Sequence, residues 1–145
     1  MPLLPPSAYT MGMPIVDDDL PRITVVVGEY LRDWLESDGV HVYPRLPSRP
    51  AWPAVRPVRI GGVMRNVRAK LDEAIMDFDV WTTGDGSAET LANKTRSYML
   101  EMTGVMHRDI VVTRTFDSAG PAPRPEDDPA LERFGFTVGL LFHPA

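Results

Sequence analysis

The segment from Leu71 to Thr82 constrains the fold most, because its residues alternate in polarity as the residues of a β-strand do. Successive side chains of a strand point to opposite faces, so this segment has one apolar face and one half-polar face. The apolar face carries Ala74, Met76, Phe78 and Val80, and the half-polar face carries Ile75, Asp77, Asp79 and Trp81. We therefore expect a sheet with the core on one side and with solvent or a partner on the other.

Two stretches with helical periodicity can cover the apolar face. They are expected at about Pro21 to Ser37 and Ser87 to Met102, each with one apolar stripe at i, i+3, i+4, i+7 spacing. Gly39 and Gly104 follow them and end them. The stripes are Ile23, Val27, Tyr30, Leu31, Trp34 and Leu35 in the first, and Ala88, Leu91, Ala92, Thr95, Tyr98, Met99 and Met102 in the second.

Four further short, β-prone segments are expected to be strands: Val40–Tyr43, Val55–Ile60, Ile110–Phe116 and Arg133–His143. The element order is then α-β-β-β-α-β-β. This order predicts the α+β class, with a mainly antiparallel sheet of about five strands and both helices packed on one face.

The remaining segments are expected to be connections. Prolines recur about every third residue from Pro44 to Pro57, which favours a stiff extended crossover. Residues Gly61–Lys70 should form a loop or hairpin tip, and Asp117–Glu132 a loop rich in proline and acid. Residues 1–19 contain several prolines and are expected to be an extended arm, followed by a single domain from 20 to 145.

Residues that carry chemistry are scarce. The chain has no cysteine, which excludes disulfides, thiolate zinc sites and cysteine nucleophiles. Its three histidines lack metal-ligand spacing, and no catalytic motif is present. Asp77 and Asp79 share a strand face and can in principle hold a divalent ion or perform acid–base work, although such alternating acids are common on exposed strand faces. We expect no enzyme, no cofactor and no metal, and neither a signal peptide nor a membrane span.

Charge is distributed unevenly along the chain. Residues 39–71 carry seven basic and no acidic side chains, whereas residues 1–38 carry seven acidic and two basic ones, and residues 72–145 carry thirteen acidic and six basic ones. The basic stretch can bind phosphate, meet an acidic part of a neighbouring copy, or be neutralised within the fold. The basic candidates for a subunit interface or a DNA-bearing lumen are Arg56, Arg59, Arg65, Arg68 and Lys70.

The half-polar strand face, with Asp77, Asp79 and Trp81, is a second candidate interface, because an exposed tryptophan beside acids suits a wet protein contact. The alternative is that the second helix or the proline-rich segment covers Trp81 within the monomer.

Four motifs in fixed order resemble a known family. They are LRDWL at 31–35 leading to GVHV at 39–42, PAVRPVRIGG at 53–62, FDVW at 78–81 followed by AETLANKTR at 88–96, and ERFGFTV at 132–138. Their order and spacing resemble those of the tail terminator (tail completion) proteins of long-tailed, siphovirus-type bacteriophages, particularly of actinobacterial hosts. The resemblance extends from about Ile23 to His143, and the arm of residues 1–19 is not part of it.

This resemblance implies a structural virion protein without catalytic residues. Such proteins form a ring, usually of six copies, on the finished tail tube at the head-proximal end of the tail. The ring stops polymerisation of the major tail tube protein and presents a surface to the head-to-tail connector, and DNA passes through its lumen. Assembly would take place in the host cytoplasm. A head-completion or connector ring of the phage neck, or a small ligand-binding domain or enzyme of α+β fold, are the alternative interpretations.

Overall fold

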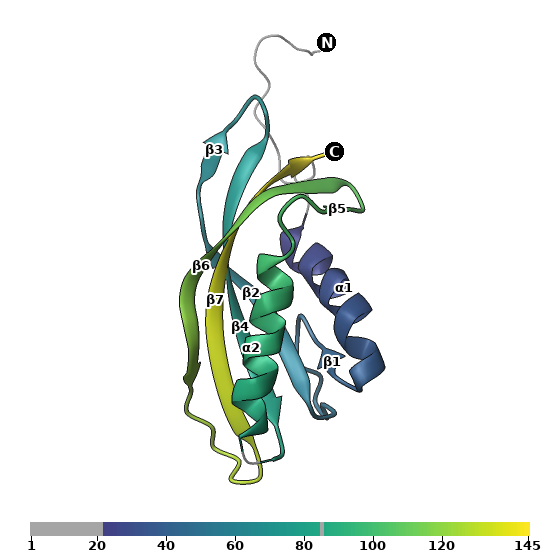
Figure 1. Cartoon of the computed structure of the whole chain (residues 1–145), viewed down its shortest axis with the longest axis vertical. Helices are drawn as coiled ribbons and strands as arrows, with labels where there is room; N and C mark the ends of the chain where they lie inside the picture. Colours follow the sequence, from purple (N-terminus) through teal and green to yellow (C-terminus); the bar gives the residue numbers. More distant parts are fainter. Residues whose placement is uncertain (1–21, 85) are drawn as a thin grey trace.

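The computed structural model describes residues 22–84 and 86–145. Two helices cover one face of a curled, mostly antiparallel sheet (Figure 1). The predicted α+β class, the order of the main elements and the placement of both helices on one face are confirmed. The elements are α1 (Ile23–Leu35), the 3-10 turn η2 (Glu36–Asp38), β1 (His41–Val42), β2 (Ala54–Gly61), β3 (Met64–Asn66), β4 (Leu71–Thr82), α2 (Ser87–Leu100), β5 (Met106–His107), β6 (Ile110–Pro123) and β7 (Glu132–Pro144).

The sheet is built around β4, which has the predicted bounds. The strand order is β1-β2-β4-β7-β6-β5, with β3 pairing back on the start of β4. β4 pairs with β7 continuously from Asp72 opposite Phe142 to Thr82 opposite Glu132. The pairing of β1 with β2 is parallel and is the exception among the described strand pairs. The described residues form a sheet of seven strands rather than about five, because the short strands β3 and β5 were not predicted.

The core lies between the helices and the apolar face of β4, as the alternation predicts. Phe78 of β4 stacks on Phe136 of β7 with ring centroids 4.7 Å apart, and both side chains are fully buried. The α1 stripe is buried against this layer, with one exception. Trp34 is 46% exposed and stacks on Tyr98 of α2, at a centroid distance of 4.9 Å. The predicted stripe of α1 thus also supplies a contact between the helices at their solvent edge.

The segment after Phe116 differs from the loop predicted from the sequence. It was expected to be a loop from Asp117 to Glu132, but β6 continues to Pro123 and pairs with β7 as far as Phe134. Its register shifts three times between Val112 and Ala122. Beyond β5, this strand has no described partner on its outer side, where a residue without an N–H costs no ladder bond. An edge strand with bulges therefore accommodates a composition that otherwise indicates a loop.

The segment predicted as a loop or hairpin tip projects beyond the helices (Figure 1). β2 passes through Gly61 and Gly62 into β3, and residues 67–70 turn the chain into β4. The backbone N–H of Glu73 donates to the carbonyl of Val63 at 3.0 Å, which holds the returning strand in place. At Gly62 the φ angle is +115°, and a Cβ there would lie 1.9 Å from the Glu73 carbonyl oxygen. Glycine is therefore required at this close approach of two backbones.

The predicted arm, residues 1–19, and the expected helix start at Pro21 lie outside the described residues. Within the described part of the chain, no helix is long and apolar enough to cross a membrane.

Candidate functional site: a charged cluster and a basic hairpin

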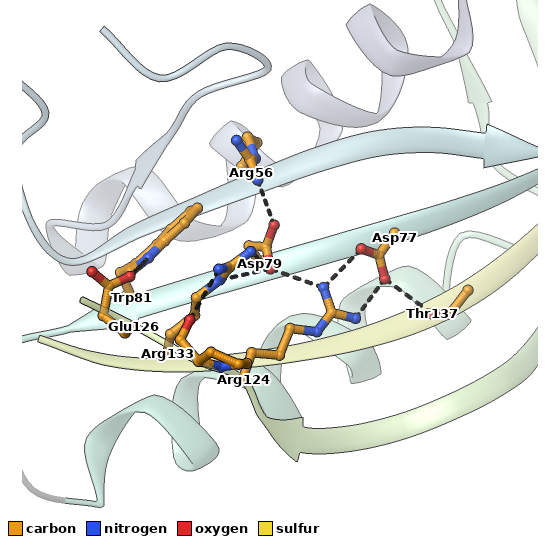
Figure 2. Close-up of polar contacts among 9 residues, drawn as sticks. Arg56, Asp77, Asp79, Trp81, Arg124, Glu126, Arg133 and Thr137 are labelled. Atoms are coloured by element: carbon orange, nitrogen blue, oxygen red, sulfur yellow. Dashed lines mark hydrogen bonds and ion pairs between the residues drawn. The ribbon is translucent and has the colours of Figure 1, made fainter. Parts of the chain in front are cut away.

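The outer face of the sheet, away from the helices, carries a cluster of charged side chains. Figure 2 shows its members converging from β2, β4, β7 and the connection after β6. Four of the predicted candidates belong to it, and four further residues join them. The outer-face cluster comprises Arg56, Asp77, Asp79, Trp81, Arg124, Glu126, Arg133 and Thr137.

Asp79 is the centre of the cluster and accepts hydrogen bonds from three guanidinium groups. Its carboxylate oxygens lie 2.7 Å from Arg56 Nη2, 2.8 Å from Arg124 Nη1 and 2.9 Å from Arg133 Nη2. The Asp79 side chain is 5% exposed, and such burial by itself raises the pKa of a carboxyl. The hydrogen bonds from Arg56, Arg124 and Arg133 outweigh it and hold the pKa of Asp79 below its usual value. Asp79 is therefore an ionised structural acid at neutral pH.

Arg124 links the connection after β6 to the centre of the sheet. Its Nη2 and Nη1 lie 2.6 and 2.7 Å from the two carboxylate oxygens of Asp77, and hydrogen bonding to Asp77 is the largest influence raising the pKa of Arg124. Asp77 also accepts a hydrogen bond from the Thr137 hydroxyl at 3.1 Å. The arginine reaches across Gly135, where a Cβ would lie 1.9 Å from Arg124 Nε. Bidentate pairing of this kind fixes geometry as well as charge.

Trp81 is 4% exposed, so the structure agrees with the alternative in which it is covered within the monomer. The guanidinium groups of Arg56 and Arg133 each lie 5.3 Å from its ring centroid. Trp52 of the proline-rich segment packs against it at 5.8 Å, and its indole N–H donates to Glu126 at 2.9 Å. The expectation of an exposed tryptophan on this face is corrected, because cationic side chains and the proline-rich segment cover it.

The cluster has the chemistry of a structural clamp. Both carboxylates that could hold a divalent ion are occupied by arginines, so they have no oxygen pair free for a cation. The described residues include no group of three histidine, aspartate or glutamate side chains placed to ligate a metal. The cluster instead restrains the β6–β7 connection, because Arg133 also donates to the Pro125 carbonyl at 3.1 Å.

The remaining four candidates lie on the projecting hairpin and do not meet the cluster. Arg59 pairs with Asp72 at 3.1 Å, and Arg65 pairs with Glu73 at 2.7 Å. Arg68 and Lys70 form no ion pair with a described residue. Between these side chains three apolar residues are exposed to 52–60%. We call this group the hairpin surface: Arg59, Ile60, Val63, Arg65, Val67, Arg68 and Lys70.

Arg124, Glu126, Arg133 and Thr137 were not among the residues predicted from the sequence. The sequence pattern of the last strand could have indicated two of them, because Arg133 and Thr137 alternate with apolar core residues and so share its second face. Gly135 and Gly139 lie on that same face, and small residues there leave room for long side chains crossing from β6. Arg124 and Glu126 lie in a segment predicted as a loop, so their partners could not be assigned.

A groove of about 520 Å³ lies between the helical layer and the end of β4. Val40, Pro53, Leu91 and other largely apolar or hydroxyl-bearing residues line it. Among its described lining residues the one ionisable side chain is Lys94, which pairs with Asp38 at 2.5 Å. The lining residues that the structure describes therefore do not form the converging titratable groups of an active site.

Comparison with known proteins gives a likeness of fold. No protein family and no curated protein sequence matches the chain, whereas 24 chains of solved structures do. One of them belongs to the virion of a native gene transfer agent (GTA) particle. It aligns over 83% of this chain and 94% of its own with a TM-score of 0.66 and 12% identity. Another aligns over 85% and 93% with 16% identity, and its TM-score of 0.49 is too low to support an inference. The first likeness shows that the two chains share a fold.

Proposed function

We propose that this chain is a structural virion protein that acts as a tail terminator. In this proposal several copies, six as in the tail terminators that the chain resembles, close into a ring at the head-proximal end of the tail. The ring stops growth of the tail tube and provides the surface on which the head-to-tail connector docks. DNA crosses its lumen without sequence-specific binding.

The likeness to a virion chain carries this proposal. The alignment takes in nearly the whole of the GTA virion chain, so the shared part is the complete domain rather than a common substructure. Fold alone does not determine function, so the order of the four sequence motifs supplies the second, independent support. Together they favour a virion component and, within that class, a tail terminator.

The surface of the molecule is consistent with assembly. A ring needs two different patches on each copy, because each subunit contacts the next head to tail. The hairpin surface, with its exposed apolar and basic side chains, is one such patch. The side chains available for catalysis on the outer face are saturated by one another, which favours a structural role over an enzymatic one.

Tube assembly in vitro tests the proposal. The tail tube protein of the same virus is polymerised with and without this chain, and the length and ends of the tubes are recorded by negative-stain microscopy. We expect shorter tubes that carry a ring of extra density at one end. Heat-denatured chain, added at the same concentration, is the control.

Other outcomes of these binding and assembly experiments would contradict the proposal or favour one of the alternatives. Unchanged tube lengths with bare ends would contradict the terminator assignment. Rings that bind the isolated connector but not the tube would favour the head-completion alternative. A monomer that binds a small molecule in the groove beside Lys94 would favour the ligand-binding alternative.

A further inference from the structure

The hairpin surface has the composition of a protein contact. Ile60, Val63 and Val67 are 60%, 52% and 60% exposed. The hairpin around β3 that carries them lies at one end of the molecule's long axis (Figure 1). Apolar side chains this exposed, gathered on one projecting hairpin and mixed with arginine, are typical of interface patches. Something other than water is therefore expected to cover this end.

Nucleic acid fits this surface less well than protein does. Phosphate binding depends on cations that are free to replace counterions. Two of the four cations are already engaged, Arg59 by Asp72 and Arg65 by Glu73. The apolar residues between them offer nothing to a phosphate backbone. A partner that combines a few carboxylates with apolar surface suits the patch better.

The opposite end of the same molecule has that composition. The β6–β7 connection lies at the other end of the long axis (Figure 1) and carries Glu126, Asp127 and Asp128 in succession. Asp127 and Asp128 are exposed and form no ion pair with a described residue. Exposed Pro125, Pro129 and Ala130 flank them. We call residues 125–130 the acidic loop.

The outer-face cluster fixes the acidic loop in position. Arg133 donates to the Pro125 carbonyl, and Trp81 donates to the Glu126 carboxylate. Within the loop, the Asp128 backbone N–H donates to Glu126 and the Ala130 N–H donates to Asp128. A loop restrained in this way loses little conformational freedom when a partner binds it.

We infer that the hairpin surface of one copy docks on the acidic loop of the next copy. The two patches are complementary in charge and apolar character, and they lie at opposite ends of one chain, so the contact is heterologous and can propagate around a ring. This inference rests on the proposed ring. It adds that Arg68 and Lys70 meet Asp127 and Asp128 of the neighbour, with Ile60, Val63 and Val67 against its exposed prolines and alanine.

Charge reversal at each end tests the contact. Variant H is Arg68→Glu with Lys70→Glu, and variant L is Asp127→Lys with Asp128→Lys. Ring formation is measured by native mass spectrometry over a concentration series. Each variant alone should require at least about tenfold more protein to form rings, because like charges then face each other across every contact.

Two rescues make the test specific. An equimolar mixture of H and L should form rings in which the two variants alternate, because each reversed hairpin then meets a reversed loop. A chain carrying all four substitutions should also form rings alone, since both of its ends are reversed. Mixing experiments detect alternation by mass, because H and L differ in mass.

The control is Arg45→Glu with Arg49→Glu, which makes the same charge change on exposed residues of the proline-rich segment. It should leave the concentration for ring formation unchanged. Circular dichroism of every variant confirms folding.

Several results would overturn the inference. The inference is wrong if H or L forms rings at the same protein concentrations as the wild type. It is also wrong if both rescues fail although the variants are folded. Duplex DNA binding that variant H abolishes, with its rings intact, would assign the hairpin to nucleic acid. If the wild-type chain forms no ring under any condition, the proposed function fails with the inference. If the wild-type chain forms rings and variants H and L form them at the same protein concentrations, the inference alone fails.

Discussion

At the residue scale, the distinctive feature is a central strand whose outer face is buried by arginines. Asp79 is enclosed by three guanidinium groups that each keep a quarter to a third of their side chain exposed. Their partial hydration lowers the desolvation cost that makes fully buried ion pairs unfavourable. The result is a polar face that is closed to solvent at its centre and that needs no apolar cover.

Asp79→Asn should destabilise the chain, because it leaves three converging cations with no anion at their centre. We expect the free energy of unfolding to fall by about 2–3 kcal/mol, below the 3–5 kcal/mol of fully buried pairs. Urea unfolding at pH 7 measures it. Asp117→Asn, which breaks the exposed pair with Arg96, is the control and should cost less than about 1 kcal/mol. Equal losses in the two variants would contradict the central role of Asp79.

The effect of Asp79→Asn on the free energy of unfolding should depend on pH. The pKa of Asp79 lies below its usual value of 3.8 in the folded chain, so folding favours the ionised carboxylate. The stability that the ionised Asp79 contributes is complete above the pKa of this carboxyl in the unfolded chain, and it is lost as the pH falls through the pKa in the folded chain. The stability difference between wild type and Asp79→Asn should therefore be constant from about pH 5 to 7 and shrink below about pH 4. A difference that stays constant down to pH 2.5 would contradict this.

Gly135→Ala tests whether Arg124 must cross the sheet at this point. The added Cβ would overlap Arg124 Nε and push the guanidinium away from Asp77 and Asp79. We expect a loss of about 1–3 kcal/mol in the free energy of unfolding. In an Arg124→Ala background the same change should cost less than about 0.5 kcal/mol, because the obstacle is gone. Additive losses would show that Gly135 matters for another reason.

At the element scale, local patterns predicted most of the fold. The alternation in 71–82 gave β4 its bounds and its core face, and two helical stripes placed both helices. The full length of β6 was missed because its prolines are tolerated by an edge strand, and edge position is a property of the whole sheet. The ion pairs of the cluster were missed for the same reason: the contact of Arg124 with Asp77 depends on how β6, β7 and β4 pair.

The hairpin offers a matched pair of substitutions at this scale. Gly62→Ala places a Cβ against the Glu73 carbonyl and forces a left-handed φ on alanine, whereas a Cβ at Gly61 meets nothing within 4 Å. Gly62→Ala should therefore strain the hairpin by about 1–3 kcal/mol. Hydrogen exchange at the Glu73 amide should accelerate in Gly62→Ala and stay near wild type in Gly61→Ala. Similar exchange in both variants would show that the close approach is not needed.

At the scale of the whole molecule, the structure separates two roles. The helices and the apolar sheet face form the core, and the outer-face cluster ties the β6–β7 connection to that core. The two ends of the long axis then carry complementary patches, the hairpin surface and the acidic loop (Figure 1). A molecule with two unlike ends suits repeated head-to-tail contacts between copies.

The mass of the purified wild-type chain under native conditions shows whether the chain forms the proposed ring. We expect a closed oligomer of defined size, about 97 kDa for six copies of the 16.2 kDa chain. The same particles should appear as rings with a central hole in negative stain. A single species at 16.2 kDa at all protein concentrations up to the millimolar range would contradict the proposed ring.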